Sequence, residues 1–350
     1  MMSVMSAYIG RLYKGLRGEI LVLPSRTVAL LFCLALFLLP LVMAHPYYLG
    51  ILTLAGIYAI FAASWDLLSG FTGQINFGHA IFFGVAVYTA ALLNVHVGLD
   101  PWLTIPLGAL AAVVAGLVVG VPCLRLRGTY LAFVTLAFPL ILVEIIKLIP
   151  GTGGTLGVSA IGSVDSLSSS PVIEYYIAVA LMIGLGFAMW KITDSKTGII
   201  FHAIREDQVA ARASGINTTR YKLLAFCLSG FFAGIAGGLY VHHTGDASPL
   251  TLGLLVSFQA IIWAIFGGIA TIYGPIAGVF LLYPLAEYLR GPIFEYRMLL
   301  VAITVLLVML FMPEGLIPRV RDKIEKVCPR CKLRNVSTRK SCRVCTADLD

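Results

Sequence analysis

Long stretches of apolar residues, separated by short polar segments, recur from residue 27 to residue 316. Many of them approach about 20 residues, the length that an α-helix needs to cross the roughly 30 Å hydrocarbon core of a bilayer. Apolar residues follow one another continuously instead of alternating with polar ones, which favours helices over the strands of a membrane barrel. The pattern predicts an all-α bundle of about ten membrane-spanning helices, within a range of eight to eleven.

The predicted spans follow one another along most of the chain. They cover residues 27–44, 47–65, 76–95, 102–121, 130–148, 175–190, 223–241, 252–269, 273–286 and 298–312. The first span has 18 residues and is preceded by 26, so we interpret it as an uncleaved anchor and not as a secretory signal. The expected organisation is an N-terminal segment (1–26), a membrane domain (27–316) and a C-terminal tail (317–350).

Composition and charge agree with this pattern. Hydrophobic residues make up 59% of the chain and charged residues 12%, which excludes an ordinary water-soluble domain. Lys and Arg gather in segments 1–26 and 191–222, whereas 150–170 has neither. Since basic loops stay in the cytoplasm, this distribution predicts that both termini are cytoplasmic and that 150–170 lies outside, with Arg290 and Arg297 as exceptions.

The C-terminal tail carries most of the chain's net charge of +8. Residues 319–350 contain ten Lys or Arg and four Asp or Glu, which gives this segment a net charge of +6. Such a tail suits the anionic surface of the cytoplasmic leaflet or an acidic partner, and simple solvation is the alternative.

Four of the seven cysteines also lie in this tail, as two C-x-x-C pairs separated by ten residues. They are Cys328, Cys331, Cys342 and Cys345. Two such pairs supply the four thiolates that Zn(II) prefers in a structural site, so the spacing predicts a small zinc ribbon. The alternative is a pair of disulfides or a ribbon without metal, but a reducing cytoplasm favours zinc. Four protein ligands leave no open position, which indicates a structural or docking role.

A cluster of polar residues and glycines begins the predicted third span. It comprises Gln74, Asn76, Gly78 and His79. Polar groups within a span tend to face the bundle interior or a wet cavity, and interrupted helices are common at transport sites. The cluster therefore predicts a pathway or a gate. The alternative is that the glycines serve helix packing while the polar groups bond to neighbouring helices.

The charged segment 192–222 carries two consecutive alanines and, after three intervening residues, a glycine. These are Ala210, Ala211 and Gly215. The arrangement resembles the coupling segment of the permeases of branched-chain amino-acid ABC transporters, in which a short helix engages the ATPase. The glutamate that precedes the alanines in that family is replaced by Val209, and Glu206 is the nearest acidic residue. Further resembling stretches are 68–80, 126–132, 151–157 and 313–316.

The resemblance covers about residues 47–316 and not the tail. It implies a permease subunit that forms the translocation pathway for branched-chain or related amino acids. It also implies a second homologous permease subunit, two ATPase subunits and an extracytoplasmic substrate-binding protein, in the cytoplasmic (inner) membrane of a bacterium or archaeon. The chain has no Gly-x-x-x-x-Gly-Lys-Ser/Thr phosphate-binding loop, so ATP hydrolysis is expected on a partner chain. Neither enzymatic activity nor nucleic-acid binding is expected of this chain.

Three other functions remain open from the sequence. A urea or short-amide permease of the same family differs mainly in its binding protein. A self-sufficient secondary carrier usually has an acidic group deep within a span, whereas Asp66, Glu144 and Glu287 are expected near span ends, where charged groups reach the interface. A membrane-anchored zinc sensor or assembly factor explains the tail but not ten spans.

Overall fold

The computed structural model describes residues 24–42, 45–123, 126, 129–158, 161–289, 315–329 and 334–336, with isolated positions between 299 and 312 and at 342, 345 and 348. Most of the predicted tenth span and Cys331 lie outside the described residues. The chain divides into two compact units, 44–315 and 1–43 with 316–350.

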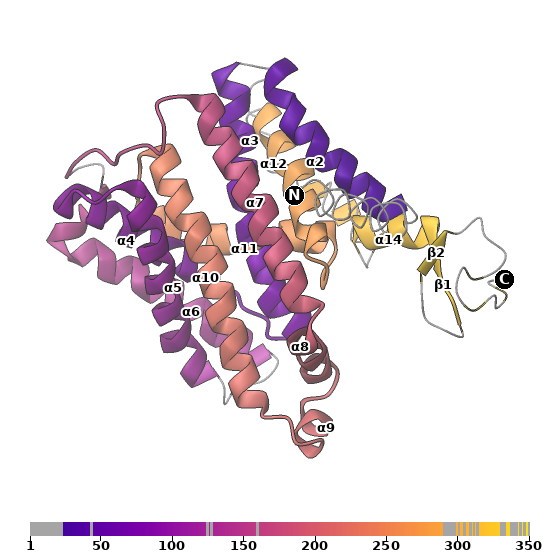
Figure 1. The fold of residues 1–350 in the computed structure, drawn as a ribbon. Helices are drawn as coiled ribbons and strands as arrows, with labels where there is room; N and C mark the ends of the chain where they lie inside the picture. Colours follow the sequence, from indigo (N-terminus) through magenta and orange to yellow (C-terminus); the bar gives the residue numbers. More distant parts are fainter. Residues whose placement is uncertain are drawn as a thin grey trace, which may run out of the picture. The chain divides into compact units, whose positions relative to one another are not determined.

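Helices form the larger unit throughout its described part (Figure 1). In chain order they are α3 (Pro46–Trp65) with the π-helical turn η2 (Asp66–Gly70), α4 (Ala80–Val97), α5 (Pro101–Cys123), α6 (Thr129–Leu148), the short η3 (Pro150–Thr152), α7 (Pro171–Thr193), α8 (Lys196–Glu206), α9 (Gln208–Ala213), α10 (Thr218–Thr244), the short η5 (Pro249–Leu252), α11 (Leu254–Gly267) and α12 (Tyr273–Tyr288).

Six helices in the described part of the chain are long and apolar enough to cross a membrane. They are α3 with η2, α4, α5, α6, α7 and α10. The all-α, multi-pass prediction is confirmed, whereas the count of ten spans stays a prediction. α11 is an apolar helix of 14 residues, and α4 begins at Ala80, four positions after the predicted start of the third span at residue 76.

Proline and glycine mark several helix ends. Pro46, Pro101 and Pro171 stand at the first positions of α3, α5 and α7, where the missing N–H has no helical partner to lose. Gly98 and Gly245 follow α4 and α10 with φ of 69° and 70°, a left-handed conformation that ends a helix and that glycine adopts without steric cost. The sequence thus sets these boundaries locally.

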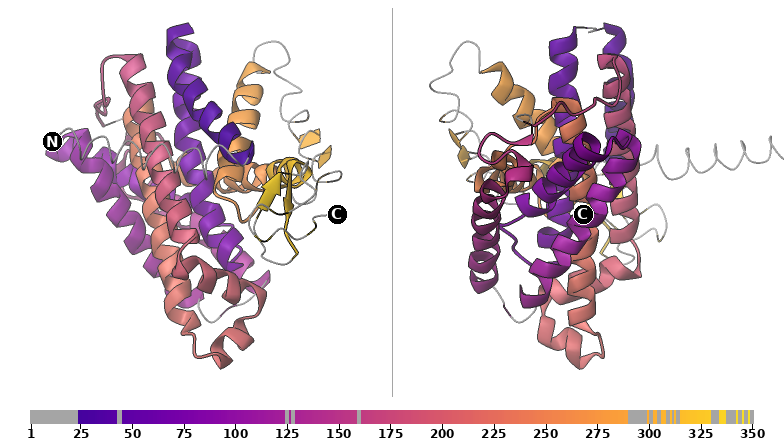
Figure 2. Two further views of the ribbon diagram at one scale, coloured as in Figure 1. Left: turned by 45° about the vertical axis from the view of Figure 1, so that its right-hand side comes forward. Right: turned by 90° about the vertical axis from the view of Figure 1, so that its left-hand side faces the viewer.

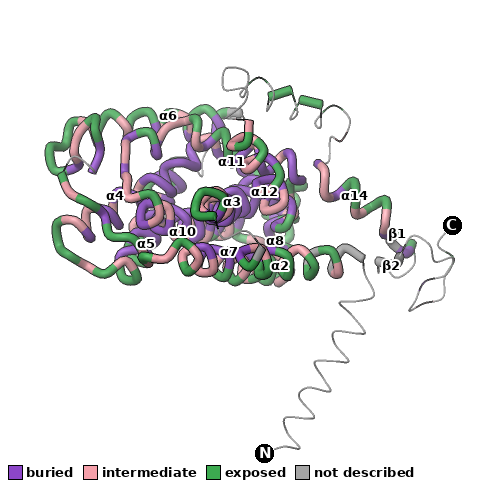
Figure 3. The backbone as a smooth tube through the Cα atoms, turned by 90° about the horizontal axis from the view of Figure 1, so that it is seen from above, coloured by how far each residue is buried: buried purple, intermediate pink, exposed green. Residues whose placement is uncertain are grey.

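α3 lies at the centre of the larger unit. It contacts α7, α10, α11 and α12, while α10 also contacts α4 and α5. Of the apolar window of α3, 78% is buried within the chain, compared with 28% for α6. Figure 3 shows a similar contrast between two other helices, since buried residues run along α10 while α6 is mostly exposed or intermediate. In a membrane, the open apolar face of α6 meets lipid or another subunit.

Glycines on one side of α10 allow its close approach to α4 and α5. A Cβ at Gly230 would lie 2.9 Å from the carbonyl oxygen of Ala112, and a Cβ at Gly234 would lie 2.6 Å from the Cα of Ala109. A Cβ at Gly237 would collide with the backbone of α4 at Phe83. Small residues at such spacing let membrane helices pack backbone to backbone, where dispersion contacts replace the hydrophobic effect.

The described part of the smaller unit contains two helices and a hairpin. α2 (Pro24–Val42) contacts α14 (Leu316–Ile324), which leads into β1 (Glu325–Val327). β1 pairs antiparallel with β2 (Arg334–Val336). This hairpin carries the beginning of the cysteine-rich tail.

Replacing Gly234 with valine is expected to destabilise the helix bundle by about 1–3 kcal/mol, the usual cost of overpacking a tight interface. The thermal midpoint of the purified protein in detergent should fall. It is measured by size-exclusion chromatography after heating. Gly184→Val in α7 is the matched control, because a Cβ at Gly184 meets nothing within 4 Å. Equal thermal midpoints for the two variants would contradict the proposed packing of α10.

Candidate functional site

The predicted polar cluster lies in a buried interruption between η2 and α4. Gln74, Asn76 and His79 are 2%, 1% and 0% exposed. The indole N–H of Trp65 donates to the carbonyl oxygen of Asn76 at 2.7 Å, and the backbone N–H of Asn76 donates to Ser69 Oγ at 3.2 Å. Side chains of the preceding helix therefore bind backbone groups that a continuous helix would have paired internally.

Neighbouring helices bind the rest of this interruption. The N–H of Phe77 donates to Thr135 Oγ1 of α6 at 3.1 Å, and the N–H of Ala80 donates to Ser257 Oγ of α11 at 2.8 Å. The Ser64 hydroxyl donates to the carbonyl oxygen of Phe61, which leaves its oxygen to accept from His79 Nε2 at 2.9 Å. These bonds fit the packing interpretation of the cluster.

Two features of the cluster bear on the pathway interpretation. The N–H of Gly78 donates to Asn76 Oδ1 at 2.9 Å, whereas Asn76 Nδ2 is buried and has no hydrogen-bond partner within the described part of the chain. A Cβ at Gly78 would collide with the carbonyl oxygen of Thr135, so the interruption packs directly on α6. The pathway or gating role of these residues stays a prediction.

A second interruption separates α11 from α12 and is bound by Asp66. The two oxygens of this carboxylate accept hydrogen bonds from the N–H groups of Ala270 and Thr271, at 2.7 and 2.9 Å. Asp66 is 0% exposed. The expectation that it reaches the membrane interface is therefore wrong. Its partners lie in a loop distant in sequence, which the local pattern of residues does not reveal.

The predicted coupling segment, for which the resemblance implies a short helix, forms two helices, α8 and α9. Asp207 has extended backbone angles, and its carboxylate accepts from the N–H groups of Val209 and Ala210 at 2.7 and 3.1 Å, so that α8 ends and α9 begins there. Gly215 has φ of 83° and ends the segment, with the N–H of Ile216 donating to the carbonyl oxygen of Ala211 at 3.1 Å.

Polar bonds hold α9 against the start of α10. Lys222 Nζ donates to Gln208 Oε1 at 2.9 Å, and Arg212 Nε donates to Thr218 Oγ1 at 2.8 Å. Figure 1 and both views of Figure 2 place α8 and α9 together, at one end of α7 and α10. α9 therefore presents a fixed surface and is not a free loop.

The predicted coupling residues divide into exposed and buried ones. The exposed ones, together with their exposed neighbours, form what we call the coupling surface: Glu206, Val209, Ala210, Ala213 and Gly215. Ala211 is 5% exposed and faces the bundle, whereas Val209 is 61% exposed. An exposed apolar side chain flanked by small residues leaves room for a partner's side chains.

Arg205 connects the coupling segment with the first interruption and was not among the predicted site residues. Its guanidinium donates to the carbonyl oxygen of Gly70 at 2.5 Å. The neighbouring His202 ring lies edge-on to Phe71, with centroids 5.2 Å apart. Partial burial lowers the pKa of His202 below its usual value of 6.5, and Arg205 adds to this effect while Glu206 opposes it. His202 is therefore neutral at pH 7 and packs as an uncharged ring.

A different set of polar contacts joins the opposite ends of α4, α5 and α10. His242 lies 2.6 Å from Thr104 Oγ1 through Nε2 and 2.7 Å from the carbonyl oxygen of Asp165 through Nδ1. Asn94 Nδ2 donates to the Asp165 carboxylate at 3.1 Å. These bonds fix the segment before α7, for which an outside position stays a prediction from the charge distribution.

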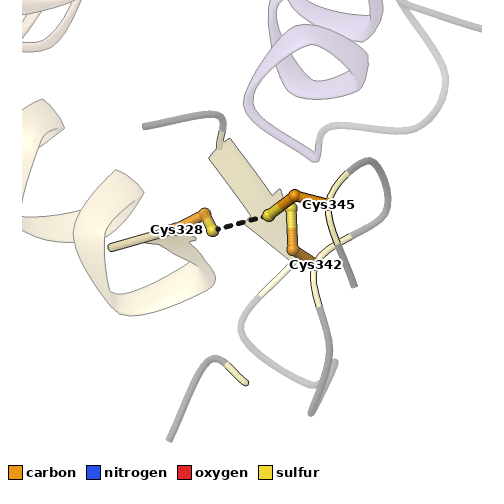
Figure 4. Close-up of side chains that lie close together, drawn as sticks. All are labelled: Cys328, Cys342 and Cys345. Carbon is orange, nitrogen blue, oxygen red and sulfur yellow. Dashed lines mark hydrogen bonds between the residues drawn. The ribbon is translucent and has the colours of Figure 1, made fainter. Parts of the chain in front are cut away.

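Three of the four tail cysteines come together next to the hairpin (Figure 4). The sulfurs of Cys328, Cys342 and Cys345 all lie within 4.8 Å of one another, and the first two side chains are buried. Tetrahedral Zn–S bonds of about 2.3 Å place sulfurs about 3.8 Å apart, so this cluster is close enough to bind a metal. Cys328 and Cys345 are 3.4 Å apart, whereas a disulfide needs about 2.05 Å. The Asn335 amide donates to Cys342 Sγ at 3.5 Å.

Comparison with known proteins places the helical unit in one family. The family described as branched-chain amino acid transport system / permease component matches residues 47–310. That range contains both helix interruptions and the coupling segment, whereas the tail cysteines lie beyond it. No solved structure matches the chain.

Individual relatives agree with this family. The high-affinity branched-chain amino acid transport system permease protein LivM of Escherichia coli (strain K12) is 32% identical over 330 residues, which cover 85% of this chain and 76% of LivM. LivH of Salmonella typhimurium is 25% identical over 296 residues, and BraD of Pseudomonas aeruginosa is 27% identical over 305 residues. Both matches cover 79% of this chain and 95% of the relative. The chain therefore belongs to the family of permease components of branched-chain amino acid transport systems.

Proposed function

We propose that this chain is one of two membrane subunits of an ATP-driven importer for branched-chain or related amino acids. The coupling surface carries the proposal, because it presents Ala210 and Gly215 at one end of the α7 and α10 pair in a chain of this permease family. The names of LivM, LivH and BraD, all high-affinity branched-chain amino acid transport permeases, support this class of substrate.

The importer has four further components in this proposal. The chain resembles both LivM and LivH of Escherichia coli, two different permease proteins, which supports a second homologous permease subunit. Two separate ATPase subunits hydrolyse ATP, since the chain has no phosphate-binding loop. An extracytoplasmic protein binds the substrate and delivers it, and lipid surrounds the open apolar faces.

The charge pattern supports one orientation of the bundle in the inner membrane. Segment 191–222 carries six Lys or Arg and includes the coupling surface, so this end faces the cytoplasm together with both termini. The end fixed by Asp165 and His242 then faces outside and meets the binding protein. The interruption that holds Asn76 and His79 lies near the cytoplasmic side, where it acts as a gate.

Two alternatives differ in their observable consequences. A urea or short-amide importer has the same architecture with a different binding protein. A secondary carrier requires an intramembrane acid that exchanges ions, and Asp66 is the buried acid of α3 with η2. Both oxygens of Asp66 accept from backbone N–H groups, which supports a structural role over ion exchange.

The test is to purify the tagged chain in mild detergent, identify the proteins that accompany it, and assay ATP hydrolysis with candidate amino acids and the binding protein. Recovery of ATPase subunits and a second permease, with hydrolysis stimulated by one loaded binding protein, is the expected result. A chain that purifies alone and still transports in liposomes would replace the importer with a secondary carrier.

Replacing Gly215 with valine should lower uptake at least tenfold while membrane insertion and substrate binding by the binding protein stay unchanged. Its φ of 83° costs a branched residue about 1–2 kcal/mol and deforms the coupling surface, although the added Cβ meets nothing within 4 Å. Gly98→Val is the matched control, because Gly98 combines φ of 69° with open space at the other end of the bundle. Uptake that falls equally in both variants would refute the coupling role of Gly215.

For the tail, we propose a structural zinc site formed by Cys328, Cys331, Cys342 and Cys345. The clustered sulfurs of three of these residues support it, and so does the Asn335 amide, since metal-bound thiolates commonly accept such hydrogen bonds. The segment between the two cysteine pairs is short and polar, so metal binding supplies most of its folding free energy. The basic tail then serves as a docking element for an acidic partner or the anionic leaflet.

The double variant Cys328→Ser, Cys342→Ser should lose the zinc that the wild-type chain retains at about one ion per chain, as measured by elemental mass spectrometry after dialysis. Cys227→Ser in α10 is the control, because Cys227 lies outside the cluster. Full zinc content in the double variant would exclude the ribbon.

A further inference from the structure

The turn between α11 and α12 has an unusual backbone that depends on Asp66. Ala270 has φ of 60° and is the non-glycine residue with positive φ within the described part of the chain. A left-handed residue with a Cβ costs about 1–2 kcal/mol. The Asp66 carboxylate offsets this cost by accepting the N–H groups of Ala270 and Thr271. The conformation of the turn is therefore coupled to the position of η2.

Gly70, at the end of η2, lies directly against the same turn. A Cβ at this position would collide with Asp66 Oδ1 and would lie 2.8 Å from the backbone nitrogen of Ala270. Only glycine lets the end of η2 and the turn approach this closely. A displacement of η2 is transmitted to the turn because no space separates them.

The other side of Gly70 is bound by the coupling segment. Its carbonyl oxygen accepts from Arg205, whose positive charge also acts on the Asp66 carboxylate. Gly73, with φ of 69°, packs on Arg205 so closely that a Cβ there would lie 3.2 Å from Arg205 Cγ. Arg205 stands two residues before Asp207, the N-cap of α9, the second helix of the coupling segment. Contacts of Arg205 with Gly70, of Gly70 with Asp66 and of Asp66 with Ala270 thus connect the coupling segment to the turn between α11 and α12.

We infer that Arg205 and Asp66 are positioning residues that transmit movement of the coupling segment to the turn at residues 268–272 and so link ATP hydrolysis to opening of the pathway. The inference rests on the proposed function, because it requires an ATPase docked on the coupling surface. Neither residue touches the transported molecule in this account.

Arg205 and Asp66 differ in their access to water, which suits a link that changes between two arrangements better than a permanently fixed one. Arg205 is exposed along part of its side chain, so its bond to Gly70 can break and re-form in contact with water. Asp66 is fully buried and its carboxylate has no access to water, so it stays with its backbone partners. When α8 moves, either η2 and the turn move with it as one body, or the hydrogen bond from Arg205 to Gly70 breaks and leaves them in place. Two discrete arrangements of packed elements are the physical basis of such coupling.

The experiment compares transport with ATP consumption in the complete complex, reconstituted in liposomes with its loaded binding protein. Arg205→Ala is expected to keep the complex assembled and hydrolysing ATP while substrate imported per ATP falls at least fivefold. Arg205→Lys retains a donor and a positive charge and is expected to restore at least half of the wild-type ratio. Arg220→Ala, which removes an exposed arginine of the same segment, is the control and should leave the ratio unchanged.

A second variant tests the buried end of the link. Asp66→Asn keeps the volume of the side chain but replaces one acceptor oxygen with a donor, so one of the two backbone bonds is lost. The same fall in substrate imported per ATP is expected, with Asp194→Asn, an exposed carboxylate at the end of α7, as the control.

Three results would overturn the inference: an unchanged ratio in Arg205→Ala, loss of the assembled complex in that variant, or loss of hydrolysis in proportion to transport. Loss of the complex would assign Arg205 to assembly, and loss of hydrolysis in proportion to transport would assign Arg205 to the contact with the ATPase itself. Failure of the proposed function is distinguishable from all three, because the wild-type complex would then neither hydrolyse ATP in response to the binding protein nor import amino acids.

Discussion

Backbone N–H and C=O groups cannot be left unpaired inside an apolar helix bundle, and the larger unit depends on how this constraint is met where its helices are interrupted. Between η2 and α4, hydroxyl groups of Ser69, Thr135 and Ser257 accept hydrogen bonds from the N–H groups that have no helical partner. Between α11 and α12, the Asp66 carboxylate does so. Each interruption is thus bound to helices other than its own, and the polar groups that satisfy the backbone also fix how the helices are arranged.

Packing and polar contacts divide the bundle into parts with different mechanical properties. α10 lies backbone to backbone against α4 and α5 through its glycines, which leaves little freedom for relative sliding. The end of η2 is different, because it meets the turn before α12 and the coupling segment through a few polar bonds and the close approach at Gly70. A transporter needs one part that stays rigid and another that rearranges, and these two types of contact provide both.

The sequence predicts much of this arrangement and fails where partners are distant along the chain. Continuous apolar runs predict the helices, and the glycines and polar residues at 74–79 mark an interruption because they break such a run. Asp207 is a common type of helix N-cap, so the sequence itself carries a local signal for the division of the coupling segment. Asp66 and Arg205 had none, since their bonds cross 204 and 135 positions of sequence. A charged residue near a span end is usually solvated, and only tertiary structure shows that Asp66 is enclosed.

The distance in sequence between Asp66 and its partners also matters while the protein is being made. The ribosome synthesises α3 long before Ala270 and Thr271, which follow Asp66 by 204 and 205 residues. Until those residues emerge, a carboxylate destined for the bundle interior has none of its backbone donors, and an unpaired charge in hydrocarbon is unfavourable. α3 therefore cannot settle at its final depth and packing as soon as it is inserted. The packing around Asp66 is completed only after the turn before α12 has been synthesised, and a chain truncated before residue 270 leaves this carboxylate without its backbone donors.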